Sequence, residues 1–384
     1  MSSWPSWGLE RQERLNNALK VLGECDGDFE KLKRKIAASR TTWLVAGLVD
    51  GISQRHETPP SPPEFTVIAT DGSQIDVDRH QSTRCCLINL GSVTLNYGAN
   101  PGAILESQPH LYSGEEELVI APTDGKGREQ PIEGGLLGIK RGVDECHRLT
   151  ELAATQPPGS LTLALLDGTL ILWGLEAYPD FVTEALLNNG FLRCLNEMRN
   201  LNGDRQIALA SYISFPRSTD VVNALRVAIC PHEPADCDRH CPSVKERGCA
   251  AVSGVRDREL FLGLLENGER SALFTSPSQI VTKRYGEHQI HFFYLNVDDE
   301  IARVEVPRWV ATDRELLDLV HCLVLDQCRR GHGYPVALSE AHEKAVVTGA
   351  DREYFWQLVE ASLVDAQLPS LTSAKSRSKK TRWV

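Results

Sequence analysis

Two short strings with the same arrangement of residues hold the side chains best suited to chemistry. ATDGSQ occupies residues 69–74, and LLDGTL occupies residues 165–170. In each string an apolar, β-prone run leads into Asp-Gly and a hydroxyl residue, and the two aspartates are Asp71 and Asp167. A buried strand that ends in a carboxylate, followed by glycine for a tight turn, commonly presents a metal ligand or an acid at a phosphate site. Two such ends could converge on one site for Mg²⁺ or Mn²⁺, which prefer hard oxygen ligands.

A third string, GYPVALSEAH, supplies Tyr334 and His342 from a distant part of the chain. Ser339 is a good N-cap, so we expect a helix to begin at Glu340 and to carry His342 in its first turn. A histidine can bind Mn²⁺ or transfer protons near neutral pH. The alternatives are a partly buried structural histidine and a tyrosine that only packs.

A predicted helix over residues 136–154 offers further carboxylates. A two-metal phosphodiester site needs three or four acidic or imidazole ligands. Glu145 follows Arg141 by one helical turn, so these two side chains share a helix face. We favour Glu145, while Glu151 and Asp144 stay open and any of the three could be a solvated helix carboxylate.

Residues 230–253 differ from the rest of the chain in composition, because they are rich in cysteine, proline, histidine and charged residues. Cys230, Cys237, Cys241 and Cys249 are separated by six, three and seven residues. Four thiolates could hold a structural Zn²⁺ or an iron–sulfur cluster. The segment lacks a CxxC knuckle, so reduced thiols without a metal, or a disulfide, are the alternatives.

The composition narrows the class of protein. The chain has 384 residues, a formal net charge of −11 and 11 cysteines. An acidic balance argues against a protein that coats DNA, but less against a nuclease, whose site needs carboxylates. The sequence shows no N-terminal signal pattern and no run near the roughly 18 apolar residues of a membrane span. We therefore expect a cytoplasmic protein with mostly free thiols and no membrane partner.

The elements that must position these residues form an α/β pattern. Helix is predicted from residue 8 to about residue 50, and strands are predicted over 65–70 and 161–166. A hairpin is predicted around Gly91, from strands over 83–90 and 92–97. Strands with intervening helices indicate a mixed α/β sheet, compatible with a ribonuclease H-like core.

With these residues in hand, the chain resembles the NurA nuclease family over about residues 64–348. The matching blocks occur in the family's order: the two Asp-Gly strings, RVEVPRWVA at 303–311, and GYPVALSEAH at 333–342. Each block alone is weak, whereas together they are specific. Thr169 stands where the family more often has serine, a change that keeps the hydroxyl.

The resemblance implies a ribonuclease H-like mixed sheet flanked by helices. It also implies Mn²⁺-dependent (or Mg²⁺-dependent) cleavage of DNA, by 5′-to-3′ exonuclease and single-strand endonuclease activity. The implied partners are DNA, a hexameric HerA-type ATPase and a second copy of the chain, and the implied setting is end resection in double-strand break repair.

Carried over by motif, the resemblance makes Asp71, Asp167 and His342 metal ligands and places Tyr334 beside them. The family's central glutamate matches Glu145 best, with Glu151 still possible. The expected organisation is an N-terminal helical segment (1–55), a nuclease domain (64–350) with a Cys-rich insertion (230–253), and a basic tail (370–384).

Two rival functions remain. An ATPase or sugar kinase of the actin-like class also places Asp-Gly-hydroxyl loops around a metal, but it needs a late Gly-rich adenosine loop that this sequence lacks. The other rival is a non-catalytic partner of a DNA translocase, which would dock through the Cys-rich segment and the basic tail.

Overall fold

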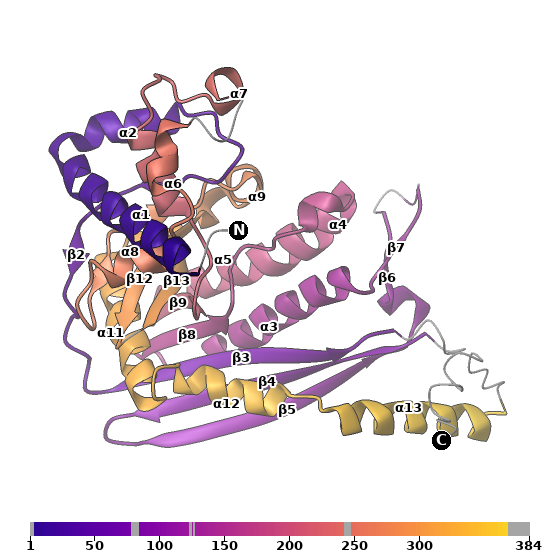
Figure 1. Ribbon diagram of the computed structural model, residues 1–384. Coiled ribbons are helices and arrows are strands. Elements are labelled where there is room, and N and C mark those ends of the chain that lie inside the picture. The colour runs from indigo at the N-terminus through magenta and orange to yellow at the C-terminus, as the bar shows by residue number, and fades with distance from the viewer. Residues whose placement is uncertain are drawn as a thin grey trace. The chain divides into compact units, whose positions relative to one another are not determined.

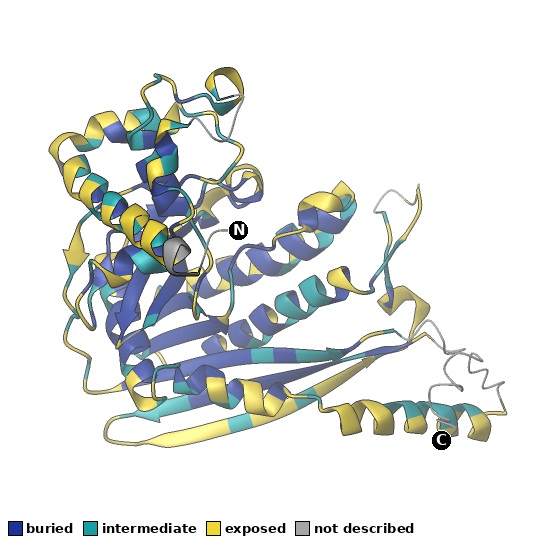
Figure 2. Cartoon of the chain, in the orientation of Figure 1, coloured by how far each residue is buried: buried dark blue, intermediate teal, exposed yellow. Residues whose placement is uncertain are grey.

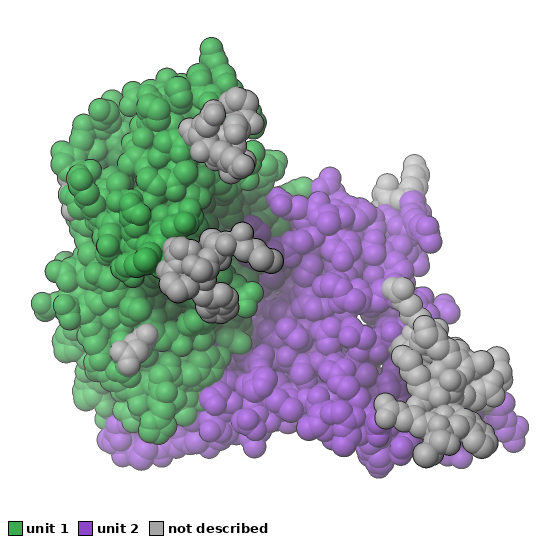
Figure 3. All heavy atoms as spheres, in the orientation of Figure 1, with its two compact units in different colours: residues 1–66, 157–171, 201–336 green, residues 67–156, 172–200, 337–384 purple. Residues whose placement is uncertain are grey.

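The computed structural model describes residues 4–77, 84–122, 125, 127–241, 247–298 and 300–367. The predicted basic tail at 370–384 lies outside these residues. The chain is a mixed α/β protein with a large mixed sheet, flanking helices and N-terminal helices, which confirms the predicted fold class and is consistent with a ribonuclease H-like fold (Figure 1). Two compact units make up the chain, and Figure 3 colours them separately: unit 1 is residues 1–66, 157–171 and 201–336, and unit 2 is residues 67–156, 172–200 and 337–384.

Unit 1 begins with helices and continues into a set of strands in which β8 and β9 run parallel and the neighbouring pairs run antiparallel. Its strands are β1 (Gly47–Leu48), β2 (Arg55–His56), β8 (Leu161–Asp167), β9 (Gln206–Ile213), β10 (Arg270–Ser271), β11 (Phe274–Thr275), β12 (Ile290–Val297) and β13 (Glu300–Pro307). Its helices are α1 (Trp4–Glu24), α2 (Phe29–Ala37), α6 (Asp220–Ala228), α7 (Cys237–His240), α8 (Asp257–Leu262), α9 (Gln279–Arg284), α10 (Arg308–Ala311) and α11 (Arg314–Arg330).

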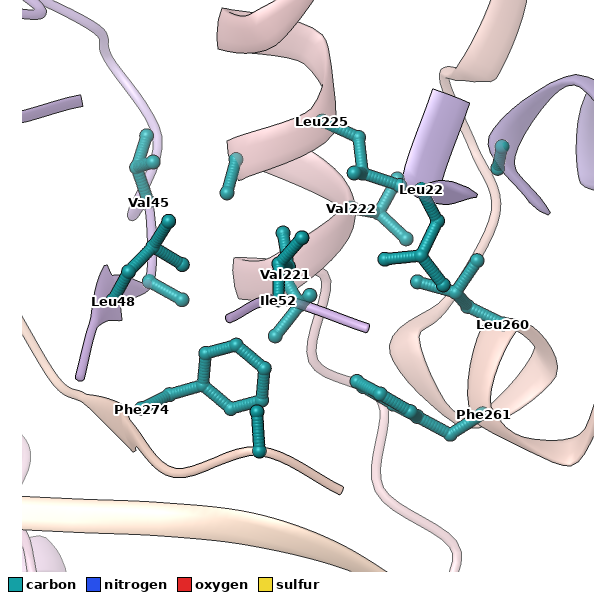
Figure 4. Close-up of a cluster of buried hydrophobic side chains, with 14 of the residues drawn as sticks. Leu22, Val45, Leu48, Ile52, Val221, Val222, Leu225, Leu260, Phe261 and Phe274 are labelled. Atoms are coloured by element: carbon teal, nitrogen blue, oxygen red, sulfur yellow. The ribbon is translucent and has the colours of Figure 1, made fainter. Parts of the chain in front are cut away.

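The two faces of β12 carry different helices. Phe292 and Tyr294 are buried in a hydrophobic cluster that includes residues of α1, α6 and α8 (Figure 4). Phe293 lies between them in sequence and packs near His321 of α11, with ring centroids 6.3 Å apart. Because successive side chains of a strand point to opposite faces, unit 1 has helices on both sides of β12.

Unit 2 combines a meander of strands with long helices. Its strands are β3 (Phe65–Ile75, whose first two residues belong to unit 1), β4 (Cys86–Tyr97), β5 (Gly102–Tyr112), β6 (Val119–Ile120) and β7 (Gln130–Pro131). Its helices are α3 (Gly135–Thr155), α4 (Asp180–Thr183), a π-helix (Glu184–Phe191), α5 (Leu192–Leu201, whose last residue belongs to unit 1), α12 (Val336–Ala345, whose first residue belongs to unit 1) and α13 (Gly349–Asp365). Figure 2 shows that β3 and β4 are largely buried, whereas β5 and α13 are mostly exposed.

Two glycines that were predicted to mark strand ends lie inside strands. β3 continues through Asp71 and Gly72 to Ile75, so the predicted tight turn after Asp71 is wrong. β4 continues through Gly91 and pairs with β5, so the predicted hairpin around Gly91 is also wrong. Each glycine instead admits a close neighbour, because a Cβ there would lie within 2.6 Å of another residue's oxygen.

Two helix boundaries also differ from expectation. α12 begins at Val336, so Ser339 is not an N-cap and His342 lies in the second turn. Helix in the N-terminal segment stops at Ala37, and β1 and β2 occupy part of the rest. A short 3₁₀ helix, Cys25–Asp28, separates α1 from α2. Among the described residues, no helix is both long and apolar enough to cross a membrane.

We predict that Gly91→Ala destabilises unit 2. A Cβ at position 91 would lie 2.0 Å from the carbonyl oxygen of Ala341 and 2.5 Å from the amide nitrogen of Ala345, both backbone atoms of α12. Backbone cannot move as a side chain can, so we expect a loss of about 2 kcal/mol or more in the free energy of unfolding. Urea denaturation measures this loss of unfolding free energy.

The matched control is Gly142→Ala, in the middle of α3, where a Cβ would meet nothing within 4 Å. That substitution should stabilise by up to about 1 kcal/mol, because alanine favours helix over glycine. Equal unfolding midpoints for the two variants would contradict the close approach at Gly91.

Candidate active site

In unit 2, strand β3 and helix α12 bring Asp71 and His342 together. Nδ1 of His342 lies 2.7 Å from Oδ2 of Asp71, and Oδ1 of Asp71 accepts a hydrogen bond of 2.8 Å from the amide of Gly72. The side chain of Asp71 is 15% exposed and that of His342 is 64% exposed. The structure therefore gives a recessed carboxylate and an open imidazole in direct contact.

The C-terminal end of α12 is held by strand side chains. The amide of Asn89 on β4 donates to the carbonyl oxygens of Lys344 and Ala345, at 3.1 and 2.9 Å. The hydroxyl of Ser73 on β3 donates to the carbonyl oxygen of Ala345 at 2.5 Å. These bonds satisfy carbonyls that a helix end leaves without partners, and they fix His342 relative to β3.

Of the helix carboxylates, Glu145 is the one beside β3. It is 8% exposed, forms an ion pair of 3.0 Å with Arg141, and its carbonyl oxygen accepts from the hydroxyl of Thr70 at 3.0 Å. A Cβ on Gly72 would lie 2.6 Å from Oε1 of Glu145. Gly72 is therefore the residue that lets this carboxylate approach the Asp71 segment.

The other two carboxylates of α3 are engaged elsewhere. Glu151 is half exposed and pairs with Arg148 and His147. Asp144 pairs with Lys140 and accepts a hydrogen bond from the hydroxyl of Tyr112. The two alternatives that the sequence left open thus have partners of their own, on α3 for Glu151 and on α3 and β5 for Asp144.

In unit 1, Asp167 and Tyr334 form a second cluster. Asp167 ends β8 and is paired in register with Tyr212 of β9, and Gly168, with a φ of 83°, turns the chain as predicted. The hydroxyl of Tyr334 donates to Oδ1 of Asp167 at 3.0 Å. The rings of Tyr334 and Tyr212 pack edge to face, with centroids 5.6 Å apart. Burial raises the pKa of Tyr212, so its phenol stays neutral while it supports Tyr334.

A buried carboxylate that sequence reasoning missed holds the turn after Asp167. Glu305 of β13 is 1% exposed, and its Oε2 accepts from the hydroxyl of Thr169 at 2.7 Å and from the amide of Leu170 at 2.9 Å. Its Oε1 accepts from Nε of Arg303 at 2.9 Å, and Arg303 also donates to Asp220 at 2.9 Å. The available signal was the Arg-Val-Glu alternation of RVEVPRWVA, which puts both charges on one face of a strand.

The described parts of the Cys-rich segment include α7 and a 3₁₀ helix, Gly248–Val252. The amide of Cys241 donates to the carbonyl oxygen of Cys237 at 3.1 Å, so these two cysteines are one turn apart, and Arg226 lies 3.9 Å from the sulfur of Cys249. Burial raises the pKa of the Cys237 thiol. The imidazoles of His232 and His240 stack at 4.0 Å. All four predicted cysteines, Cys230 included, are free thiols, and metal binding by them stays a prediction.

The donor types at Asp71, Glu145 and His342 fit Mn²⁺ or Mg²⁺, which take carboxylate oxygens and, for Mn²⁺, imidazole. Across the described ranges, however, no group of three or more His, Cys, Asp or Glu side chains is already arranged to hold an ion. Asp71 bonds to His342, and Glu145 pairs with Arg141. A bound ion would exchange these contacts for its own.

The NurA domain model matches residues 65–347, which is more than half of the chain and includes all five predicted site residues. No curated protein matches the chain. The resemblance inferred from the motifs is thereby confirmed.

We predict that Glu305→Gln lowers the free energy of unfolding by about 3 kcal/mol, because removing one partner of a buried ion pair leaves Arg303 incompletely compensated. Chemical denaturation measures the loss. Glu197→Gln is the control, since its pair with Arg193 is about half exposed and should contribute less than about 1 kcal/mol. Similar losses in the two variants would mean that the Glu305 network does not stabilise unit 1.

Proposed function

The chain belongs to the NurA nuclease family, and from that membership we propose that it is a metal-dependent deoxyribonuclease that hydrolyses DNA phosphodiester bonds. The observation that carries the proposal is the family match over residues 65–347, which takes in every residue named for the site. The contacts within each unit support it, because Asp71 meets His342 and Asp167 meets Tyr334.

We assign Asp71, Glu145 and His342 of unit 2 as metal ligands, and we assign the same role to Asp167 of unit 1. Support for Glu145 over Glu151 comes from the glycine that admits its carboxylate beside Asp71. Bound Mn²⁺ or Mg²⁺ would supply a nucleophile by lowering the pKa of water and would neutralise charge on the phosphate.

The chain's own residues have defined tasks in this proposal. Tyr334 holds one oxygen of Asp167 by donating a hydrogen bond to it, which fixes the orientation of that carboxylate. His342 is open to solvent and can accept or return a proton at its ring nitrogens. Arg141 balances the charge of the recessed Glu145 until the site is loaded.

The proposed reaction is 5′-to-3′ exonuclease and single-strand endonuclease cleavage, in end resection during double-strand break repair. NurA nucleases generally act with a HerA-type ATPase, and we propose the same partner here, together with a homodimer in the cytoplasm. The net charge of −11 supports dependence on a motor, since an acidic protein attracts DNA poorly by itself.

We predict that Asp71→Ala abolishes Mn²⁺-dependent digestion of end-labelled linear DNA, with a loss of at least about 100-fold, because the site loses a ligand. Digestion with Mn²⁺, Mg²⁺ or EDTA is compared for single and double strands. Asp204→Ala is the control, since Asp204 is exposed and its carboxylate pairs with its sequence neighbour Arg205. Normal digestion by the Asp71 variant would refute the site.

The binding-only rival makes the opposite prediction. If the wild type stays inactive even with its cognate ATPase and either metal, while the two proteins form a complex, the chain is a non-catalytic partner of the translocase. Tight ATP binding by the isolated chain would instead favour the actin-like rival.

We also predict that Gly72→Ala impairs cleavage more than stability. The new Cβ would meet Oε1 of Glu145 at 2.6 Å and Cγ of Arg141 at 2.9 Å, and both belong to side chains that can move aside. The carboxylate is then displaced, and we expect about a tenfold or greater loss of kcat with a small change in Tm. Gly102→Ala at the start of β5 is the control, because its nearest neighbour is 3.8 Å away. Full activity in Gly72→Ala would argue against Glu145 as a ligand.

A further inference from the structure

An exposed aromatic ring is held rigidly just after β9. Phe215 is 58% exposed and has a φ of 49°, a region that bulky residues other than glycine rarely adopt. The carboxylate of Glu300 fixes the loop, because it accepts from the hydroxyl of Ser214 at 2.8 Å and from the amide of Phe215 at 2.9 Å. Backbone strain that presents an apolar ring to solvent is a cost to the fold, and such strain is concentrated at functional sites.

An arginine stacks on this ring. The guanidinium of Arg258 lies 3.4 Å from the centroid of Phe215, and it donates to the carbonyl oxygens of Phe215 and Pro216 at 3.2 and 3.5 Å. Burial and then the charge of Arg256 lower the pKa of Arg258, Glu259 raises it, and Arg11 and Arg217 lower it to a smaller extent. Three arginines and one glutamate thus act on Arg258, on a chain whose net charge is −11.

The acidic groups nearby are already engaged. Glu259 pairs with Arg11 and accepts from the amide of Arg256, and Glu300 binds the Phe215 loop. The exposed Arg217 remains beside the ring in sequence, two residues after Phe215. The surface thus offers an aromatic face and cationic groups together, the combination that binds single-stranded nucleic acid.

The position of this loop relates it to Asp167. β8 and β9 are parallel, and Asp167 is paired with Tyr212. Phe215 follows Tyr212 by three residues, so it lies at most about 11 Å from it. Asp167 and Phe215 therefore lie at the same carboxyl edge of two parallel strands of unit 1, the edge where ligands bind in open α/β sheets.

We propose that Phe215, Arg258 and Arg217 form a platform that stacks an unpaired base of single-stranded DNA and binds its phosphate next to Asp167. The proposal rests on the proposed nuclease function, to which it adds the residues that would hold the single strand. A duplex keeps its bases stacked internally and offers no free base face at this ring, so the platform selects single strands.

The test is binding without catalysis. Fluorescence anisotropy in EDTA measures the affinity of the full-length protein for three labelled DNAs. These are an oligothymidylate, an abasic strand of the same length, and a blunt duplex. We expect Phe215→Gly to weaken oligothymidylate binding about tenfold, because the stacked base is lost, and to leave the abasic strand and the duplex unchanged. Phe215→Trp should keep the affinity. Tyr354→Ala, which removes a ring that is 62% exposed on α13, is the control and should have no effect.

Two further readouts separate stacking from charge and from folding. Arg217→Ala should weaken binding of both the oligothymidylate and the abasic strand and reduce the salt slope by about one. Phe215→Gly should keep or raise the Tm, because glycine adopts the positive φ without strain. Lost binding together with a lowered Tm would mean a disturbed loop, and would overturn the platform.

The platform is also overturned if Phe215→Gly binds oligothymidylate as the wild type does, or if the wild type binds no single strand. The nuclease proposal stands or falls separately, by Mn²⁺-dependent digestion. Digestion by the wild type with unchanged binding in Phe215→Gly would refute the platform alone. Weaker oligothymidylate binding in Phe215→Gly, together with no digestion by the wild type, would support the platform and refute the nuclease proposal.

Discussion

The close approach of helices to strands at two glycines is the constraint on which the site in unit 2 depends. Gly72 on β3 admits the carboxylate of Glu145, and Gly91 on β4 admits the backbone of α12 that carries His342. A Cβ at either position would occupy space that the helix now fills. The same contact geometry explains why both glycines lie inside regular strands, where glycine otherwise costs stability.

In unit 1 the corresponding constraint is a buried ion pair, which holds the turn after Asp167. Glu305 uses one oxygen for Arg303 and the other for the turn that follows Asp167, so the carboxylate is satisfied on both sides. A buried charge is tolerable only when it is paired in this way. The buried carboxylate of Glu305 thus holds the turn that follows the exposed Asp167. One carboxylate oxygen of Asp167 accepts a hydrogen bond from Tyr334.

The sequence predicted helix α3 and strand β8, which carry Glu145 and Asp167, because these segments have a clear hydrophobic pattern. It misplaced the ends of strands at Gly72 and Gly91, since a glycine that permits close packing has the same local signature as one that permits a turn. It could not find Glu305 or Phe215, because the role of each comes from contacts with residues far along the chain. The choice of Glu145 over Glu151 became clearer only from burial and neighbours.

The central claim is that Asp71 and His342, which are in contact within unit 2, bind the same metal ion. The most direct measurement is Mn²⁺ binding, by electron paramagnetic resonance titration, to the wild type, Asp71→Asn, His342→Ala and the double variant. The account predicts that each single variant weakens Mn²⁺ binding by about tenfold or more and that the double variant loses much less than the sum of the two free-energy changes. Strictly additive losses, or undiminished Mn²⁺ binding in either single variant, would contradict it.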